Sequence, residues 1–158
     1  MNEEAETRAR GLFDRPGFLT RRLHQIYVSI YLEECEKFGT TPVQASVMQV
    51  LLIRPGADQV SLAADIGLDR TTTSNVLSRL EARGLVRREA SVEDRRIRKG
   101  FLTEAGEALI VEMQDALQRA HLRLMEPLPE EERDTFIRQL KMLVRGNNGL
   151  GRAVLKDF

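Results

Sequence analysis

The chain has 158 residues, of which 42% are hydrophobic and 30% charged, and its 24 basic and 24 acidic side chains give a net charge of zero. This composition is typical of one soluble globular domain, and since neither a long apolar run nor a secretory signal is evident, we expect a cytoplasmic protein without membrane contact. The single cysteine, Cys35, excludes an internal disulfide, and the two histidines lie too far apart for a Cys/His metal cluster, so we expect neither metal nor cofactor.

The first predicted helix follows a charged segment. Residues 1–15 are expected to form a flexible arm, and Pro16-Gly17 interrupts the chain after it. Apolar residues then recur at three- and four-residue intervals, at Leu19, Leu23, Ile26 and Ile30. This spacing predicts a helix of about 20 residues that ends near Gly39.

Two shorter helices are marked by local start and stop signals. Thr41-Pro42 is typical of a helix start, and Pro55-Gly56 would end that helix. A second helix is predicted over residues 61–66 with Gly67 as its turn, and Asp69 is suited to cap the helix that follows. A helix, a tight turn and a second helix in this order are typical of DNA-binding proteins.

The helix after Asp69 begins with small polar residues, which suits entry into the DNA major groove. Three consecutive threonines lower helix propensity, and this cost suggests a role beyond stability. Arg can bind guanine, Asn can bind adenine, and Thr or Ser can contact phosphate or the thymine methyl. An ordinary capped surface helix, ended by Gly84, is the alternative. The residues expected to contact DNA are Arg70, Thr71, Thr72, Ser74, Asn75 and Arg79.

Two short strands with a basic tip are predicted next, over residues 86–89 and 96–101. An arginine at the tip of a β-hairpin can enter the narrow minor groove, where negative potential is concentrated. Asp94 could hold this tip in shape by a hydrogen bond or ion pair with Arg96. We expect Arg95, Arg96 and Arg98 to contact DNA; the alternative is a solvated hairpin whose charges shield a sheet edge.

Basic residues are concentrated in the middle of the chain. Residues 70–99 contain nine basic and four acidic side chains, which leaves fifteen basic and twenty acidic side chains elsewhere, so the segment carries +5 and the remainder −5. A local basic patch is sufficient for phosphate contact, even in a protein of zero net charge.

Two helices are predicted to complete the chain. Thr103 would cap a long helix that the Pro-Leu-Pro of residues 127–129 breaks, and a last helix would begin with glutamates 130–132 and end at Gly146. Both carry apolar stripes that need a covering surface. The stripes are Leu109, Met113, Ala116, Ala120 and Leu124, and then Phe136, Leu140 and Val144.

These motifs together resemble the MarR (multiple antibiotic resistance regulator) family of bacterial transcription factors. The resemblance rests on Asp94-x-Arg96 followed by Leu102-Thr103-x-x-Gly106, on LDRTTTSNVLSRLEARGLV, and on PGFLTRRLHQ at residues 16–25. It implies a mostly α-helical fold with a small β-wing, which forms a single domain over residues 1–158. A winged helix-turn-helix would occupy residues 41–102, dimerisation helices residues 16–40 and 103–146, and a C-terminal tail residues 147–158.

The resemblance also implies a function. Members of this family are mostly homodimeric repressors rather than enzymes, and they are released from DNA by small molecules or oxidants. Twofold symmetry of the protein predicts a pseudo-palindromic operator in double-stranded DNA. No Gly-rich phosphate loop or spaced nucleophile and base indicates an enzyme.

A small-molecule effector is expected to bind near the first helix. Residues 21, 24, 27 and 31 share one helical face, while residue 22 lies about 100° away, towards a partner or the winged part. Basic and aromatic groups together suit an anionic molecule, either aromatic or an acyl thioester. The alternative is that these side chains are solvated, paired or packed. The candidate ligand residues are Arg21, Arg22, His24, Tyr27 and Tyr31.

Cys35 suggests a second kind of sensor. One branch of the family detects hydroperoxides through a reactive cysteine near the start of the first helix. Here the cysteine lies near the end of that helix among Glu33, Glu34 and Glu36, and nearby acids raise the pKa of a thiol, which disfavours the reactive thiolate. A winged-helix module that binds protein is a further alternative, although such modules usually lose the basic face kept here.

Overall fold

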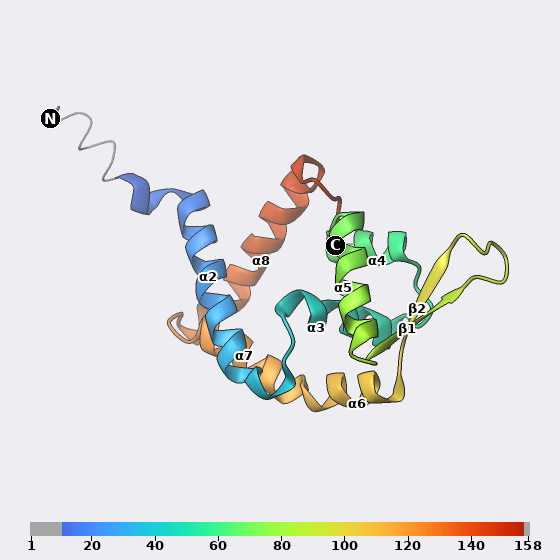
Figure 1. Cartoon of the computed structure of the whole chain (residues 1–158). Helices are drawn as coiled ribbons and strands as arrows, with labels where there is room; N and C mark the ends of the chain where they lie inside the picture. The colour runs from blue at the N-terminus through green and yellow to red at the C-terminus, as the bar shows by residue number, and fades with distance from the viewer. Residues whose placement is uncertain (1–10, 157–158) are drawn as a thin grey trace, which may run out of the picture.

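The computed structural model describes residues 11–156, and its helices and strands form two parts (Figure 1). The first part, here called the winged lobe, comprises residues 42–102. It contains α3 (Pro42–Ile53), α4 (Gln59–Ile66), α5 (Arg70–Ala82), β1 (Val86–Ala90) and β2 (Arg98–Leu102). The second part, the terminal-helix region, contains α2 (Pro16–Glu34), α7 (Gln114–Met125) and α8 (Glu130–Asn147). The helix α6 (Glu104–Glu112) connects the two parts.

The winged lobe has its own hydrophobic core. Helices α3, α4 and α5 pack on one another, and β1 and β2 form an antiparallel ribbon in which Val86 pairs with Leu102 and Ala90 with Arg98. The largest buried apolar side chains of this lobe include Val47, Met48, Leu51, Leu62, Leu77, Leu80 and Val86. The observed fold is therefore mostly helical with a two-stranded wing, as predicted.

Capping residues fix the start of each helix around the wing. The hydroxyl of Thr41 accepts the N–H of Gln44, whose side chain in turn accepts the N–H of Thr41. Asp69 caps α5 by accepting the N–H of Thr72, and Thr103 caps α6. These bonds satisfy N–H groups that have no partner inside a helix. All three predicted caps are confirmed.

A glycine lets α6 approach the winged lobe closely. A Cβ atom added to Gly106 would lie 2.0 Å from the carbonyl oxygen of Leu85. Any side chain at this position would push α6 away from the backbone of Leu85, the residue before β1. The glycine of the Leu-Thr-x-x-Gly motif thus has a packing reason.

Several element boundaries differ from the predictions. Helix α2 ends at Glu34, and a 3-10 turn, η2 (Glu36–Phe38), follows before Gly39 takes a left-handed conformation. The long helix predicted after Thr103 is divided at Met113 into α6 and α7. The last helix continues past Gly146, since a glycine in a helix costs stability without forcing an end.

The start of α4 and of β2 were also predicted wrongly. Asp58 accepts the N–H groups of Val60 and Ser61, so α4 begins at Gln59 rather than at residue 61. Strand β2 begins at Arg98, because the N–H of Ile97 bonds to the Asp94 carbonyl in the turn.

The ends of the chain differ in what they contact. The predicted flexible arm lies mainly outside the described residues, whose first element is the 3-10 turn η1 (Gly11–Asp14). After α8 and the turn η3 (Asn148–Leu150), the tail returns to the winged lobe, where the N–H of Lys156 bonds to the Ala64 carbonyl at 2.8 Å. None of the helices in residues 11–156 is long and apolar enough to cross a membrane.

Candidate nucleic-acid interface

The threonine run at the start of α5 has a structural role that the sequence alone did not reveal. The Thr72 hydroxyl donates to a carboxylate oxygen of Asp69 at 2.7 Å, and the buried Thr73 hydroxyl donates to the Asp69 carbonyl at 2.9 Å. The Thr72 hydroxyl and N–H together lower the pKa of Asp69. Two of the three threonines therefore stabilise the helix start, and Thr71 is the one with a solvent-exposed side chain.

One face of α5 is free of packing within the chain. Thr71, Asn75 and Arg79 are exposed and recur every four residues, so they lie in one row along the helix. Leu77 and Leu80 are buried on the opposite side. Ser74 and Thr72 are half-buried beside the row. The exposed row has the residue types and spacing that suit base contacts in a major groove.

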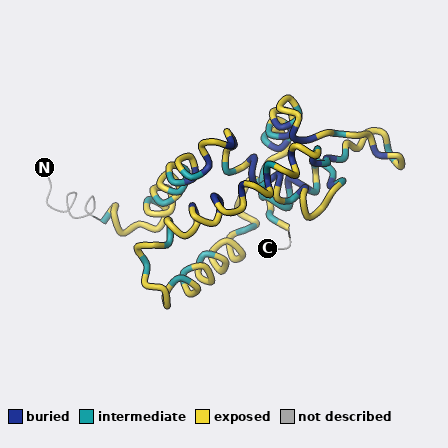
Figure 2. Tube along the Cα trace, turned by 90° about the horizontal axis from the view of Figure 1, so that it is seen from below, coloured by how far each residue is buried: buried dark blue, intermediate teal, exposed yellow. Residues whose placement is uncertain are grey.

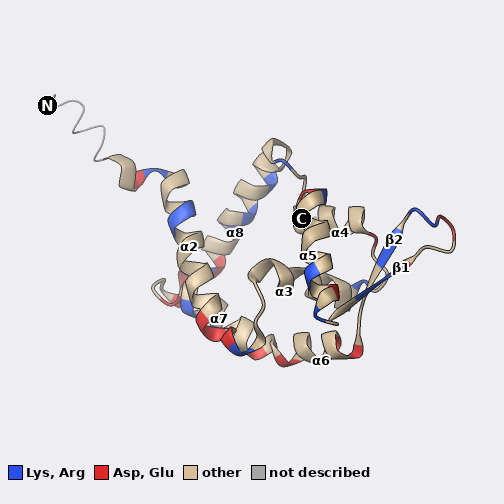
Figure 3. Cartoon of the chain, in the orientation of Figure 1, with Lys and Arg blue, Asp and Glu red and all other residues tan. Residues whose placement is uncertain are grey.

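The wing tip is held in the predicted shape. A carboxylate oxygen of Asp94 accepts the backbone N–H of Arg96 at 3.0 Å and its Nε–H at 3.3 Å. The side chain of Arg96 is nevertheless 92% exposed, and Arg95 beside it is exposed as well. The tip therefore presents guanidinium groups to solvent while its backbone is fixed. Figure 3 shows basic residues along the ribbon and acidic ones gathered around α6 and α7.

A recess joins the wing to the starts of α4 and α5. It has a volume of about 500 Å³, and the side chain of Gln59 donates to the Arg70 carbonyl across it at 3.1 Å. Three of the predicted DNA-binding arginines meet here although they come from different elements. The recess is lined by Asp58, Gln59, Val60, Arg70, Arg96, Ile97 and Arg98. A recess with three arginines in its lining is suited to a phosphate of a nucleic-acid backbone.

The candidate effector residues do not all face the same space. The buried Tyr31 hydroxyl bonds to the Thr40 hydroxyl at 2.8 Å and to the Thr41 carbonyl at 3.1 Å, and burial raises the pKa of Tyr31 to about 12. The Tyr27 ring stacks on the His121 ring of α7, with centroids 5.7 Å apart. Both tyrosines thus pack against residues of the same chain. The half-buried Tyr27 contacts α7, and the buried Tyr31 contacts the residues before α3.

The basic members of the effector set are exposed. Arg21 lies over the Phe18 ring at 5.5 Å, and His24 is exposed one turn further on. Arg22 lines an apolar crevice of about 370 Å³ between α2 and α8. The other residues of the crevice are Pro16, Leu19, Thr20, Leu23, Ile26, Phe136, Leu140 and Leu143.

Comparison with known proteins places this geometry in a family. Residues 38–97, which contain α3 to the wing tip, match the model described as MarR family. A relative from Thauera aromatica, described as a putative transcriptional regulatory protein for the hcr operon, is 33% identical over 107 residues, which is 68% of this chain and 64% of the relative. The chain belongs to the MarR family. The match therefore spans a little under two thirds of that relative's length.

Solved MarR-type structures share the fold over most of this chain. The transcriptional repressor CouR, bound to a 23-mer DNA duplex, is 29% identical with a TM-score of 0.80 and covers 85% of this chain and 95% of its own. BpsR of Bordetella bronchiseptica, solved to explain regulation of its DNA binding by 6-hydroxynicotinic acid, is 26% identical with a TM-score of 0.78, covering 82% and 92%. These relatives confirm a winged-helix regulator family rather than an enzyme family.

Some basic residues of the segment 70–99 stabilise the fold through contacts within the chain. Arg88 of β1 donates to Glu81 at 2.9 Å and to Ser78 at 3.3 Å, which fastens the wing to α5 and lowers the pKa of Glu81. Arg83 donates to two backbone carbonyls, and Arg87 pairs with Glu89 and covers the Phe101 ring. The partners of Arg83 and Arg88 lie between 7 and 45 residues away, so the charge pattern of the sequence does not predict these contacts.

The recess also contains two polar residues that the sequence analysis did not select, Asp58 and Gln59. A signal was present, because Asp58 precedes Ser61 by three positions, a spacing typical of a helix cap, and the wrong helix start concealed it.

Cys35 is buried, with an exposed fraction of 1%. Burial raises the pKa of its thiol most, and the Glu34 carboxylate raises it further. The predicted direction is confirmed, but burial rather than the surrounding acids is the main cause. Glu34 is itself held by Arg119 at 2.9 Å and Arg123 at 2.7 Å. A protonated, covered thiol is a poor nucleophile.

Proposed function

We propose that this chain is a homodimeric transcriptional repressor of the MarR family, which binds a pseudo-palindromic operator and acts in the cytoplasm, where the DNA is. The observation that carries the proposal is that Arg70, Arg96 and Arg98 line one recess at the start of α5, the helix with the exposed row. Phosphate contacts from the recess would hold the row against base edges, while the wing tip reaches the minor groove. CouR, which has this fold, was solved on DNA.

Exposed apolar side chains support the homodimer. Helix α8 has no buried residue among those the structure describes, and Leu143 on it is 60% exposed. Leu19 and Leu32 of α2 are 50% and 51% exposed. Leu19 and Leu143 line the same apolar crevice between α2 and α8, and monomeric soluble proteins rarely leave large apolar patches uncovered. A second copy would bury it and set two recognition helices one turn of DNA apart, about 10 bp.

The proposed effector is a small anionic molecule, aromatic or an acyl thioester. Arg21, Arg22 and His24 are exposed donors on one stretch of α2, and Arg22 lies at the edge of the apolar crevice that the second copy would cover. Tyr27 and Tyr31 would line the site only if α2 shifted, since both pack inwards here. BpsR, whose DNA binding 6-hydroxynicotinic acid regulates, is a precedent for an aromatic acid. To release the repressor from DNA, the effector must bind more tightly to a dimer whose recognition helices have a separation that does not fit the operator.

A gel-shift titration with DNA upstream of the chain's own gene tests the proposal. We expect a shifted band that unrelated DNA competes poorly, and release of the band by one member of a panel of aromatic carboxylates and coenzyme A thioesters. Equal competition by unrelated DNA would contradict operator binding. If peroxide released the band from the wild type but not from Cys35→Ser, the effector would be an oxidant instead.

A further inference from the structure

Residues 38–41, here called the α2–α3 corner, join the terminal-helix region to the winged lobe. Thr40 in this corner is 4% exposed. Its hydroxyl bonds to the Tyr31 hydroxyl of α2 and approaches the sulfur of Met113 at 3.7 Å, where α6 gives way to α7. The corner is thereby held to two helices of the terminal-helix region.

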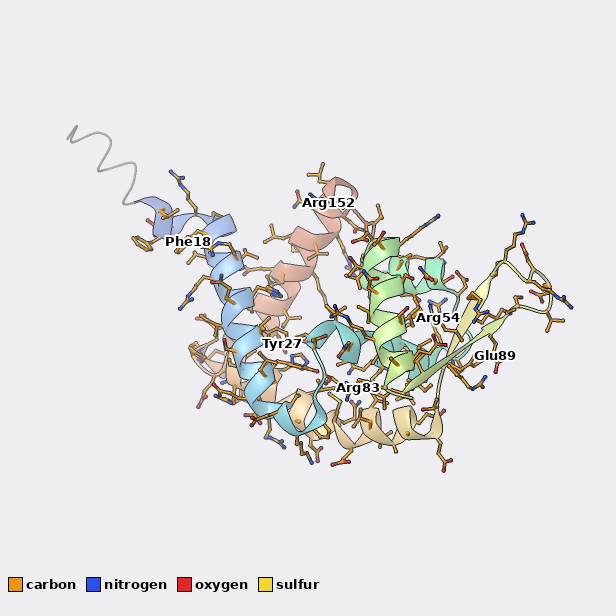
Figure 4. All side chains as sticks on the ribbon, viewed as in Figure 1. Phe18, Tyr27, Arg54, Arg83, Glu89 and Arg152 are labelled. Carbon is orange, nitrogen blue, oxygen red and sulfur yellow. The ribbon has the colours of Figure 1, made fainter. Side chains whose placement is uncertain are left out.

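A side chain at the end of α5 holds the same corner from the winged lobe. Arg83 is the C-cap residue that follows the recognition helix α5, and its guanidinium reaches the corner at the base of that helix (Figure 4). One of its terminal nitrogens donates to the Gly39 carbonyl at 2.8 Å and the other to the Phe38 carbonyl at 3.0 Å. Two parallel bonds from a planar group fix an orientation as well as a distance, which a lysine ammonium does not reproduce.

We propose that Arg83 is a positioning residue for operator binding. By holding two consecutive carbonyls of the α2–α3 corner, it fixes the orientation of α5 relative to α2 and hence the separation of the two recognition helices. This inference rests on the proposed homodimer. The same contact couples α2, which carries the candidate effector residues, to α5. Tyr31 of α2 bonds to Thr40, and Arg83 bonds to the adjacent Gly39.

The test compares variants that separate positioning from charge. Arg83→Lys keeps the positive charge and loses the paired bonds, while Arg83→Ala loses both. Lys37→Gln is the matched control, because Lys37 is an exposed basic residue next to the same corner whose ion pair with Glu112 is at the surface. Thermal unfolding of each variant verifies that it is folded.

The first measurement is the distance between spin labels in the two copies, without DNA. A label on Ile53→Cys reports the position of the winged lobe, since Ile53 is 76% exposed at the end of α3 and the native Cys35 is buried. We expect a narrow distance distribution in the wild-type background and in Lys37→Gln, and a clearly broader one in both Arg83 variants. An unchanged distribution in Arg83→Lys would overturn the proposal.

The second measurement is affinity for the operator and for operators with one base pair added or removed between half-sites. We expect Arg83→Lys to bind the native spacing about tenfold more weakly and to discriminate less between spacings. If Arg83→Lys bound like the wild type while Arg83→Ala weakened all DNA equally, Arg83 would be a phosphate contact. Wild-type labels without any dipolar coupling would instead refute the homodimer, and the positioning role with it.

Discussion

The winged lobe and the terminal-helix region differ in how much of their apolar surface is buried within the chain. Buried residues concentrate in the winged lobe, with further ones in α7 and at Tyr31 of α2, whereas the described residues of α8 are half-buried or exposed (Figure 2). The winged lobe closes around Leu51, Leu62 and Leu77 with side-chain caps at its helix starts. The difference supports the proposed homodimer, because the lobe buries a core within one chain while α8 leaves apolar side chains exposed.

This comparison has a consequence for stability. A substitution in the core of the winged lobe should act on folding at any protein concentration. A substitution on the exposed apolar face should act on association, and on folding only through mass action. The two classes can therefore be distinguished by dilution.

The largest expected effect is on the core of the winged lobe. Leu77 of α5 is 1% exposed, and Leu77→Ala should lower the free energy of unfolding by about 2–5 kcal/mol through lost burial and a cavity. Urea titration followed by circular dichroism at two protein concentrations measures the loss. Ile53→Ala, at a position 76% exposed in the same lobe, should cost less than about 0.5 kcal/mol. Equal losses in both variants would contradict the assignment of the core.

The second effect concerns association. Leu143→Glu places a charge in the apolar crevice between α2 and α8 and should weaken operator binding by about 100-fold or more, because a monomer contacts one half-site. Sedimentation should show monomers that remain folded. Lys141→Gln changes the net charge equally on the opposite side of α8 and should leave the dimer intact. A dimeric Leu143→Glu would place the interface elsewhere.

The same comparison explains which features could be predicted. Thr41, Asp69 and Thr103 act within four residues of their own position, so local chemistry is sufficient to predict the start of α3, α5 and α6. Periodicity shows that residues 24, 27 and 31 share a face, but not what covers it. That information depends on α7, which returns about 90 residues later to place His121 against Tyr27. The effector face was the part of the site least accessible to sequence reasoning for this reason.

The arginines show most clearly which side-chain contacts the sequence does not predict. The sequence marks residues 70–99 as basic, yet Arg83 and Arg88 are engaged with partners that charge patterns do not predict. Arg83 binds backbone carbonyls 44 and 45 residues away, and every residue of the chain has a carbonyl. By contrast, the bond between Asp94 and Arg96 spans two residues and was predicted correctly.

The third expected effect is on DNA contact by the wing. Arg96→Ala should weaken operator binding by about 1–3 kcal/mol without changing the dimer or the unfolding curve, because its guanidinium is exposed. Fluorescence anisotropy with labelled operator at moderate salt gives the loss. Arg95→Ala provides the comparison on the adjacent residue. A larger loss in Arg95→Ala would mean that the neighbouring arginine enters the groove, and no loss in either would remove the wing from the interface.

The smallest effect is a pH dependence at the start of α5. Hydrogen bonds from Thr72 hold the pKa of Asp69 below its ordinary value, so the charged form favours the folded state. This contribution is fully present above the pKa of an unfolded aspartate, about 4, and is lost as the pH falls through the lower folded value. Asp69→Asn keeps a capping oxygen and removes the titration. The melting temperature of the wild type should therefore fall more steeply than that of Asp69→Asn below about pH 4. Parallel curves would show that the Asp69 carboxylate does not contribute, and that the neutral cap alone holds the helix start.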